Sequence, residues 1–153
     1  MTVLLLGVLI GIVTGLRTFT GITAISWAAR FQLLHLGDTK FAFLGYLATP
    51  YILTVLALAE LVSDQLPSTP SRTVPPQFIA RLVMGSVSGA AIGLANQSLL
   101  MGILGGIIGT IAGTLGGAKA RGLLAKAFGK DMPAAFLEDA VAIGIAVLTV
   151  THL

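Results

Sequence analysis

The chain contains no cysteine, which excludes a disulfide framework, a thiol nucleophile and a thiolate metal site. Charge is also scarce: only 10% of the 153 residues are Asp, Glu, Lys or Arg, against about 25% in a typical soluble domain. So few charges cannot cover a water-exposed surface. The net charge of +3 is too small for a dense basic face, so nucleic acid is not an expected partner.

Hydrophobic residues make up 56% of the chain and come in runs as long as a bilayer is thick. We therefore expect an all-α, polytopic transmembrane helix bundle that forms a single domain over residues 1–153. The first run has no Lys or Arg before Arg17, so we interpret it as a retained helix rather than a secretory signal. The five candidate spans are about residues 2–29, 41–62, 78–95, 99–118 and 132–153.

Lys and Arg residues fall unevenly between the two sides of a five-span bundle. One side receives only Arg30 and Lys40, while the other receives Arg72, Arg81, Lys119, Arg121, Lys126 and Lys130. The positive-inside rule then predicts a cytoplasmic N-terminus and an external C-terminus, in the inner membrane of a bacterium. This orientation inverts if the first run is a hairpin that re-enters the membrane.

The first run is too long for one upright helix. Its 28 residues would form a helix about 42 Å long, against a hydrocarbon thickness of about 30 Å. The run must tilt or break, and the favoured break lies between Gly15 and Gly21, around Arg17. A break at membrane depth indicates a cavity that satisfies the exposed backbone, whereas a tilted continuous helix would let Arg17 reach the interface.

Glycines recur at four-residue intervals and form stripes along helix faces. Such stripes let helix backbones approach closely in lipid. They predict tight packing inside the chain, with one stripe left for a second copy, so a homo-oligomer, preferably a dimer, is expected beside membrane lipid. The stripes are Gly7, Gly11 and Gly15; Gly85, Gly89 and Gly93; and Gly105, Gly109, Gly113 and Gly117.

Acidic residues occur at positions where a membrane protein rarely tolerates them. Glu60 and Asp64 lie four residues apart, on one helix face. Glu138 and Asp139 lie so close to the C-terminus that the helix after them is too short to cross the membrane. We expect an ionic cluster and a solute or ion pathway built from Arg17, Glu60, Asp64, Arg72, Arg81, Arg121, Glu138 and Asp139. In it, Glu60 and Asp64 face Arg81 or Arg72, and Glu138 or Asp139 lies near Arg121.

Two segments outside the spans have distinct compositions. Residues 67–76 are rich in proline, which predicts an extended strap that closes one mouth of the bundle and presents Arg72 there. Residues 119–131 are basic with apolar residues between the charges, which predicts a loop on the anionic inner leaflet.

Several short motifs are specific in combination. They are Thr14–Thr20, Ser26–Ala29, Glu60–Asp64, Leu66–Pro75, Ala80–Arg81, Gly113–Gly117 and Leu137–Ala140. Over nearly the whole chain this set resembles a bacterial family of small membrane proteins catalogued as domain of unknown function 4126. The resemblance implies a polytopic helical protein of the bacterial cytoplasmic membrane and implies no reaction. Gln65 departs from the pattern, in which we expect a basic residue after the acid.

Enzymatic chemistry is not expected. The histidines, His35 and His152, lie far in sequence from the acids, so neither a metal site nor a nucleophile with a histidine base is predicted, and no cofactor is expected. Two function classes remain. The first is a small permease or channel for a small solute or ion, with Glu60 or Glu138 as a protonatable gate. The second is a non-transporting scaffold or lipid-binding module with structural ion pairs. A polar cavity beside Arg17 would favour the first.

Overall fold

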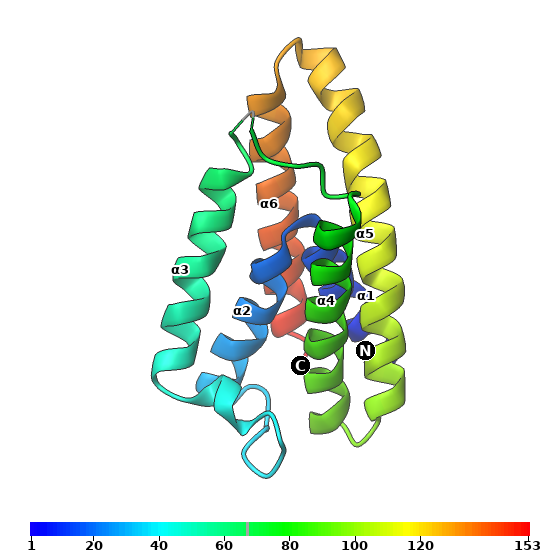
Figure 1. Ribbon diagram of the computed structural model, residues 1–153. Helices are drawn as coiled ribbons and strands as arrows, with labels where there is room; N and C mark the ends of the chain where they lie inside the picture. The colour runs from blue at the N-terminus through cyan, green and yellow to red at the C-terminus, as the bar shows by residue number, and fades with distance from the viewer. Residues whose placement is uncertain (67) are drawn as a thin grey trace.

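The structure is a computed structural model that describes residues 1–66 and 68–153. The described residues form helices and no strand, so the prediction of an all-α fold is confirmed. Figure 1 shows the helices packed as an elongated bundle. The helices are α1 (Val3–Leu16), α2 (Thr18–Arg30), the short 3₁₀ helix η1 (Ala42–Gly45), α3 (Ala48–Ser63), α4 (Pro75–Ala95), α5 (Leu99–Phe128) and α6 (Asp131–Val150).

The first apolar run is broken at Arg17 and folds back on itself. Arg17 has an extended backbone (φ −140°, ψ 114°) between the end of α1 and the start of α2. A Cβ atom on Gly21 would lie 3.2 Å from the carbonyl oxygen of Ile10, whereas residues this far apart in one helix are separated by about 16 Å. The predicted break is therefore present, and α1 and α2 form a hairpin with Arg17 at its tip.

The hairpin changes the topology expected from the sequence. The sequence predicts that residues 2–29 cross the membrane once, which would place the two termini on opposite sides of it. Because α2 returns along α1, both termini lie toward the end of the bundle opposite the segment 68–74 (Figure 1). Within the described residues, α4, α5 and α6 are each long and apolar enough to cross a membrane, while α1 and α3 are shorter apolar helices.

Two predicted helix boundaries are wrong for local reasons. The span expected at 41–62 contains a separate η1, and α3 starts only at Ala48. Pro50 explains this start, since proline lacks the amide hydrogen that any position beyond the first turn needs. The loop expected at 119–131 is helical as far as Phe128, because its alanine, leucine, lysine and arginine residues are strong helix formers. The helix ends at Gly129, in the left-handed conformation (φ 69°).

The segment between α3 and α4 agrees only in part with the predicted extended strap, because residues 68, 72 and 73 form turns and Pro75 and Pro76 belong to α4. Residues 70 and 71 have no helical or turn structure, and α4 begins at Pro75, which suits the first helical position. Pro67, the first residue of the predicted strap, lies outside the described residues. We call residues 68–74 the strap; it crosses one end of the bundle between α3 and α4 (Figure 1).

Helix α5 is the centre of the bundle, with α1 and α4 on adjacent faces. A Cβ atom on Gly11 would lie 2.9 Å from Cα of Gly109, and one on Gly89 would lie 3.0 Å from Cα of Gly106. Only glycine allows backbones to approach so closely. All three predicted stripes lie in such contacts within the chain, so none remains for a second copy. The glycines involved are Gly7, Gly11 and Gly15; Gly85, Gly89 and Gly93; and Gly105, Gly109, Gly113 and Gly117.

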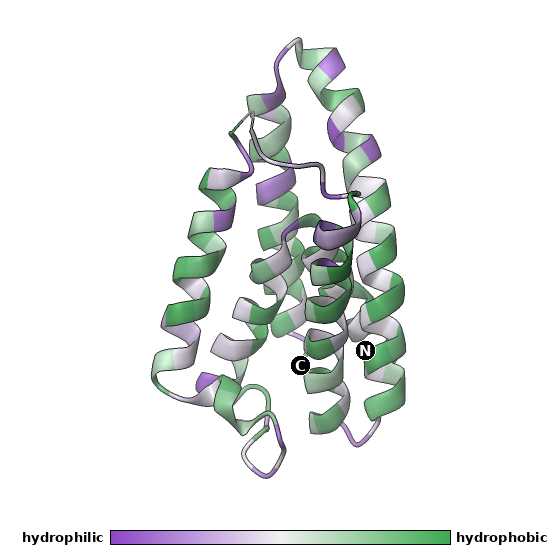
Figure 2. Cartoon of the chain, in the orientation of Figure 1, coloured by the Kyte–Doolittle hydropathy of each residue, from purple (hydrophilic) through white to green (hydrophobic). Residues whose placement is uncertain are grey.

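The outer faces of the helices are apolar. Figure 2 shows hydrophobic residues along α3, α4, α5 and α6, with hydrophilic residues gathered at the strap end and in the opposite loops. Large apolar side chains such as Val55, Ile108 and Val147 are more than half exposed. A soluble protein rarely exposes so continuous an apolar surface, so this belt fits contact with lipid.

We expect Gly109→Ala to destabilise the protein by about 1–3 kcal/mol, because the new methyl group overpacks the α1–α5 contact. Gly116→Ala on the same helix has open space around it and is expected to stabilise by up to about 1 kcal/mol through helix propensity. The two free energies of unfolding can be compared by SDS titration with circular dichroism. Equal effects of the two substitutions would contradict the proposed role of α5.

Candidate functional site

The end of α1 exposes carbonyl groups that a continuous helix would have used. Arg81, on α4, satisfies them: its Nη1 donates to the carbonyl oxygens of Gly15 and Leu16, both at 3.1 Å. The side-chain hydroxyl of Thr114 donates to the same Gly15 oxygen at 3.3 Å. A guanidinium also complements the negative end of the α1 dipole. Arg81 is 2% exposed, so it acts as a buried cap.

The start of α2 exposes amide groups in the same way. Glu60, near the end of α3, accepts hydrogen bonds from the amides of Thr18 (2.6 Å) and Phe19 (2.8 Å) with its two carboxylate oxygens. A carboxylate at a helix N-terminus also complements the positive end of the dipole. Glu60 lies 3.7 Å from Nη2 of Arg81. The two opposite charges that cap the hairpin are therefore themselves an ion pair.

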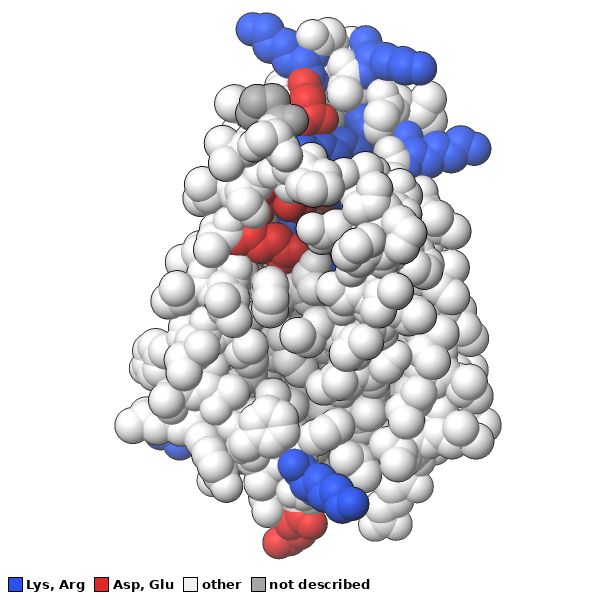
Figure 3. Space-filling model, in the orientation of Figure 1, with Lys and Arg blue, Asp and Glu red and all other residues white. Residues whose placement is uncertain are grey.

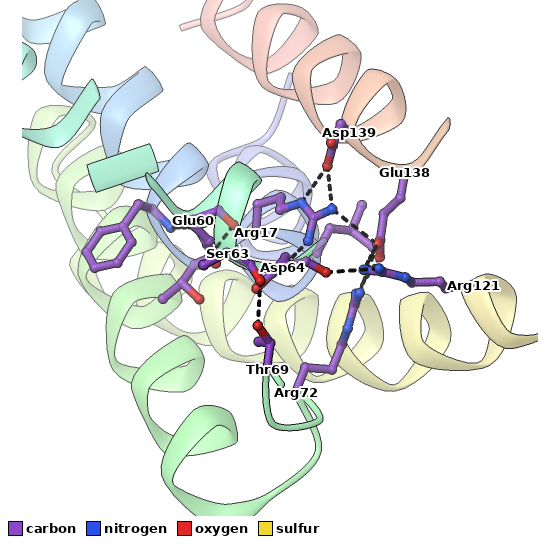
Figure 4. A network of polar contacts seen from close by, with 12 residues as sticks. Arg17, Glu60, Ser63, Asp64, Thr69, Arg72, Arg121, Glu138 and Asp139 are labelled. Carbon is purple, nitrogen blue, oxygen red and sulfur yellow. Dashed lines mark hydrogen bonds and ion pairs between the residues drawn. The ribbon is translucent and has the colours of Figure 1, made fainter. Parts of the chain in front are cut away.

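Arg17, at the tip of the hairpin, is fully buried and reaches two other helices (Figure 4). Its Nη1 pairs with Oδ2 of Asp64, at the end of α3. Its Nε donates to Oδ1 of Asp139, on α6, at 2.5 Å, and its Nη2 lies 3.7 Å from Glu138. The predicted pairing of Arg17 with carboxylates inside the protein is confirmed, and it joins α3, α6 and the hairpin.

A second set of pairs lies on the strap side of Arg17. Both terminal nitrogens of Arg72 donate to the two oxygens of Glu138, with Nη2 to Oε2 at 2.8 Å. Nη1 of Arg121 lies 3.5 Å from Glu138. Arg121 also binds Asp131 with two hydrogen bonds (3.0 and 2.6 Å) and the main-chain oxygen of Asp64 (3.1 Å). Figure 4 shows how Arg72 and Arg121 converge on Glu138 from the strap and from α5.

We call these nine charged side chains the ionic cluster: Arg17, Glu60, Asp64, Arg72, Arg81, Arg121, Asp131, Glu138 and Asp139. Four arginines face five carboxylates, which leaves one negative charge in excess. Asp131 lies at the exposed end of the cluster, with its side chain 57% exposed. The other eight residues, four arginines and four carboxylates, are buried or partly buried and balance one another.

The structure brings all eight residues of the predicted pathway together. Arg81 lies near both Glu60 and Asp64, and Arg121 lies near Glu138, as predicted. Arg72, however, pairs with Glu138 and not with the α3 acids.

Two features were not predicted from the sequence. Asp131 belongs to the cluster as a partner of Arg121, across the turn between α5 and α6. The sequence held a signal for this pairing, since Asp131 is the acidic residue that ends the basic segment 119–131. The capping of α2 by Glu60 has no signal in the sequence, because it depends on how the hairpin meets α3.

Two cavities adjoin the ionic cluster and share Asp64, Thr69 and Gln77 in their linings. The strap pocket, of about 380 Å³, lies below the strap and includes Arg72, Arg81 and Arg121. The lateral groove, of about 560 Å³, lies between α3 and α4; it is lined by Thr18, Phe19, Leu56, Ala59, Glu60, Ser63, Asp64, Thr69, Gln77, Ala80, Val83 and Met84.

On the opposite side of the cluster, the buried residues that the structure describes are uncharged, and polar ones such as Ser88 and Thr110 donate to main-chain oxygens. Leu6, Ile10, Ile25 and Ile92 form a buried core below the hairpin tip, and glycine contacts close the space between α1, α4 and α5. A third cavity, of about 390 Å³ between α2, α3 and α6, has a mostly apolar lining that includes Trp27 and Val147. The cavities beside the cluster therefore lie toward the strap and the outer face between α3 and α4.

No protein-family model, curated protein or solved structure matches this chain. The function must therefore be argued from the geometry of the ionic cluster and its cavities.

We expect Arg17→Ala to destabilise the protein by about 3–5 kcal/mol, because it leaves Asp64 and Asp139 buried without their main partner. Arg30→Ala removes an exposed charge at the end of α2 and is expected to change stability by no more than about 0.5 kcal/mol. SDS titration with circular dichroism measures both. If the two variants unfold alike, Arg17 does not organise the cluster.

Proposed function

We propose that the chain is a multi-pass protein of the bacterial cytoplasmic membrane in which α3 to α6 cross the bilayer and the α1–α2 hairpin enters it without crossing. The length and apolar character of α4, α5 and α6, together with the apolar outer belt, support this arrangement. It agrees with the resemblance to the small membrane protein family noted above. The lysines and arginines gather at the strap end (Figure 3). By the positive-inside rule that end is cytoplasmic, so both termini are external.

The absence of cysteine makes this orientation testable by labelling. Single cysteines at Thr2, Thr151 and Ser71 lie near the two termini and in the strap. In intact spheroplasts, we expect a membrane-impermeant maleimide to label the first two sites and to label the strap site only after lysis. Labelling of Ser71→Cys without lysis, together with protection of both termini, would reverse the proposed orientation.

We propose further that the protein is a small permease or channel that moves a small solute or ion through the ionic cluster. The observation that carries this proposal is the broken hairpin, whose two helix ends meet buried charges beside cavities. Broken helices of this kind line the binding sites of many transporters, because irregular backbone at membrane depth needs polar partners. Two glycine-lined contacts, of α1 and of α4, hold these helices to α5, and such smooth surfaces permit sliding. Since those stripes are used within the chain, the proposal does not require a second copy.

The geometry favours Asp64 over Glu60 as the protonatable gate. Glu60 accepts two main-chain hydrogen bonds and would leave α2 uncapped if it were protonated. Asp64 lines both the strap pocket and the lateral groove and also pairs with Arg17. A proton on Asp64 weakens its ion pair with Arg17, so binding of that proton is coupled to the position of the hairpin tip. Glu138, which pairs with Arg72 on the strap, is the second candidate.

The alternative is a non-transporting scaffold or lipid-binding module. The favouring observation is that Glu60 and Arg81 cap the ends of α2 and α1, a role that is complete without any solute. The apolar cavity between α2, α3 and α6 could then hold part of a lipid. Under this alternative, substitutions in the cluster change stability and leave flux unaffected.

Flux into proteoliposomes distinguishes the two functions. Protons, Na⁺, K⁺ and small charged metabolites serve as probes, with Asp64→Asn, Glu138→Gln and the exposed control Lys126→Gln as variants. We expect Asp64→Asn and Glu138→Gln to lower the transported flux by about tenfold or more, as loss of one charge-assisted contact predicts, and the control to retain wild-type flux. If folded cluster variants match the wild type for every probe and at every pH, the scaffold function is favoured.

A further inference from the structure

The lateral groove differs chemically from the strap pocket that it adjoins. Its lining includes two carboxylates, Glu60 and Asp64, and its remaining walls are apolar or uncharged. None of the described residues that line it is a lysine or an arginine. Arg17 and Arg81 contact the same carboxylates from inside the bundle. The face that the groove presents to a ligand is therefore acidic.

The groove opens on the belt of the protein that would face lipid. Leu56 on α3 and Val83 on α4, which both line the groove, are 40% and 53% exposed. Figure 3 shows an acidic patch in a hollow of the surface, with a few basic atoms beside it, below the larger group of basic side chains at the strap end. Carboxylates so placed are costly at membrane depth without a counter-charge.

The arginines that pair with the groove carboxylates lie behind them. Arg17 pairs with Asp64, and Arg81 lies 3.7 Å from Glu60 and 3.9 Å from Asp64, but neither arginine lines the groove. The groove volume of about 560 Å³ lies within the range of about 300–1,000 Å³ typical of small-molecule sites. The groove thus combines two carboxylates in its lining, apolar walls and room for a ligand with both a charged and an apolar part.

We propose that the lateral groove binds an amphiphilic organic cation, an ammonium or phosphonium group with an apolar body, that enters from the lipid between α3 and α4. The positive group lies against Asp64 and Glu60, and the apolar body lies against Leu56, Val83 and Met84. The ring of Phe19, beside Glu60, supplies a further favourable surface for a cation. This inference rests on the proposed function and names the substrate class of the same site.

Tetraphenylphosphonium is the probe, and tetraphenylborate, which has the same shape and the opposite charge, is its control. Binding to the purified full chain in detergent is measured by equilibrium dialysis. We expect saturable binding of the cation and at least about tenfold weaker binding of the borate, because the carboxylates attract the positive probe and repel the negative one. Equal binding of the two probes overturns the proposal.

Matched substitutions assign the binding to the groove. Asp64→Asn removes a charge, and Ala80→Phe fills the groove without changing any charge. We expect each substitution to weaken tetraphenylphosphonium binding about tenfold or more, which corresponds to about 1.4 kcal/mol of lost contacts. Ala118→Phe fills the strap pocket instead and is expected to leave binding unchanged. If Asp64→Asn fails to fold, Ala80→Phe decides. Wild-type binding by folded Ala80→Phe overturns the proposal.

The binding test addresses the cation site and the flux test addresses the permease, so one proposal can fail while the other holds. Binding of tetraphenylphosphonium that Ala80→Phe abolishes, without flux of any probe, supports the cation site and contradicts the permease. Flux that depends on Asp64, without tetraphenylphosphonium binding, supports the permease and overturns the cation site.

Discussion

The constraint on which the structure depends is the interruption of the first helix inside the bundle. A helix end leaves carbonyl or amide groups without partners, and at membrane depth no bulk water replaces them. The α1–α2 hairpin exposes both kinds of helix end, and only Arg17 separates them. Arg81 serves the carbonyls and Glu60 serves the amides. The positions of α3 and α4 are thereby tied to the tip of the hairpin, because each of these helices carries one of the caps.

Arginine suits these positions for reasons of geometry. Its planar group offers five donors, so Arg17 can bind carboxylates from α3 and α6 at once, and Arg72 can hold both oxygens of Glu138. A lysine has three donors on a single nitrogen and lacks the planar fork that binds both oxygens of one carboxylate. Gly117 provides the space, since a Cβ atom there would lie 3.0 Å from Arg72 and 3.1 Å from Glu138. The glycine stripe of α5 thus serves helix packing over most of its length and the ionic cluster at its end.

The sequence predicts the parts of this structure that arise from local composition. The helical class, the position of the break and eight of the nine cluster residues, all but Asp131, follow from hydropathy, from the length of the first run and from the cost of charge in lipid. The direction of α2 does not follow, because a chain with glycines around Arg17 can continue or turn back with the same hydropathy. That single choice decides which side each terminus occupies. The partners of Arg72 and Glu60 likewise depend on tertiary packing that no local pattern encodes.

The ionic cluster lies toward one end of the bundle, and this asymmetry limits how a solute could cross. Below the hairpin tip, α1 and α2 are packed by Ile10 and Ile25, which are fully buried, so a polar path to the opposite end requires movement of the hairpin itself. The contacts that resist such movement are of two kinds. The glycine contacts of α1 with α5 are smooth, whereas the ion pairs of Arg17 with Asp64 and Asp139 are directional. Neutralising one carboxylate therefore weakens the directional restraint and leaves the smooth one intact. A proton or a cation that neutralises a carboxylate beside Arg17 can therefore control whether the hairpin moves.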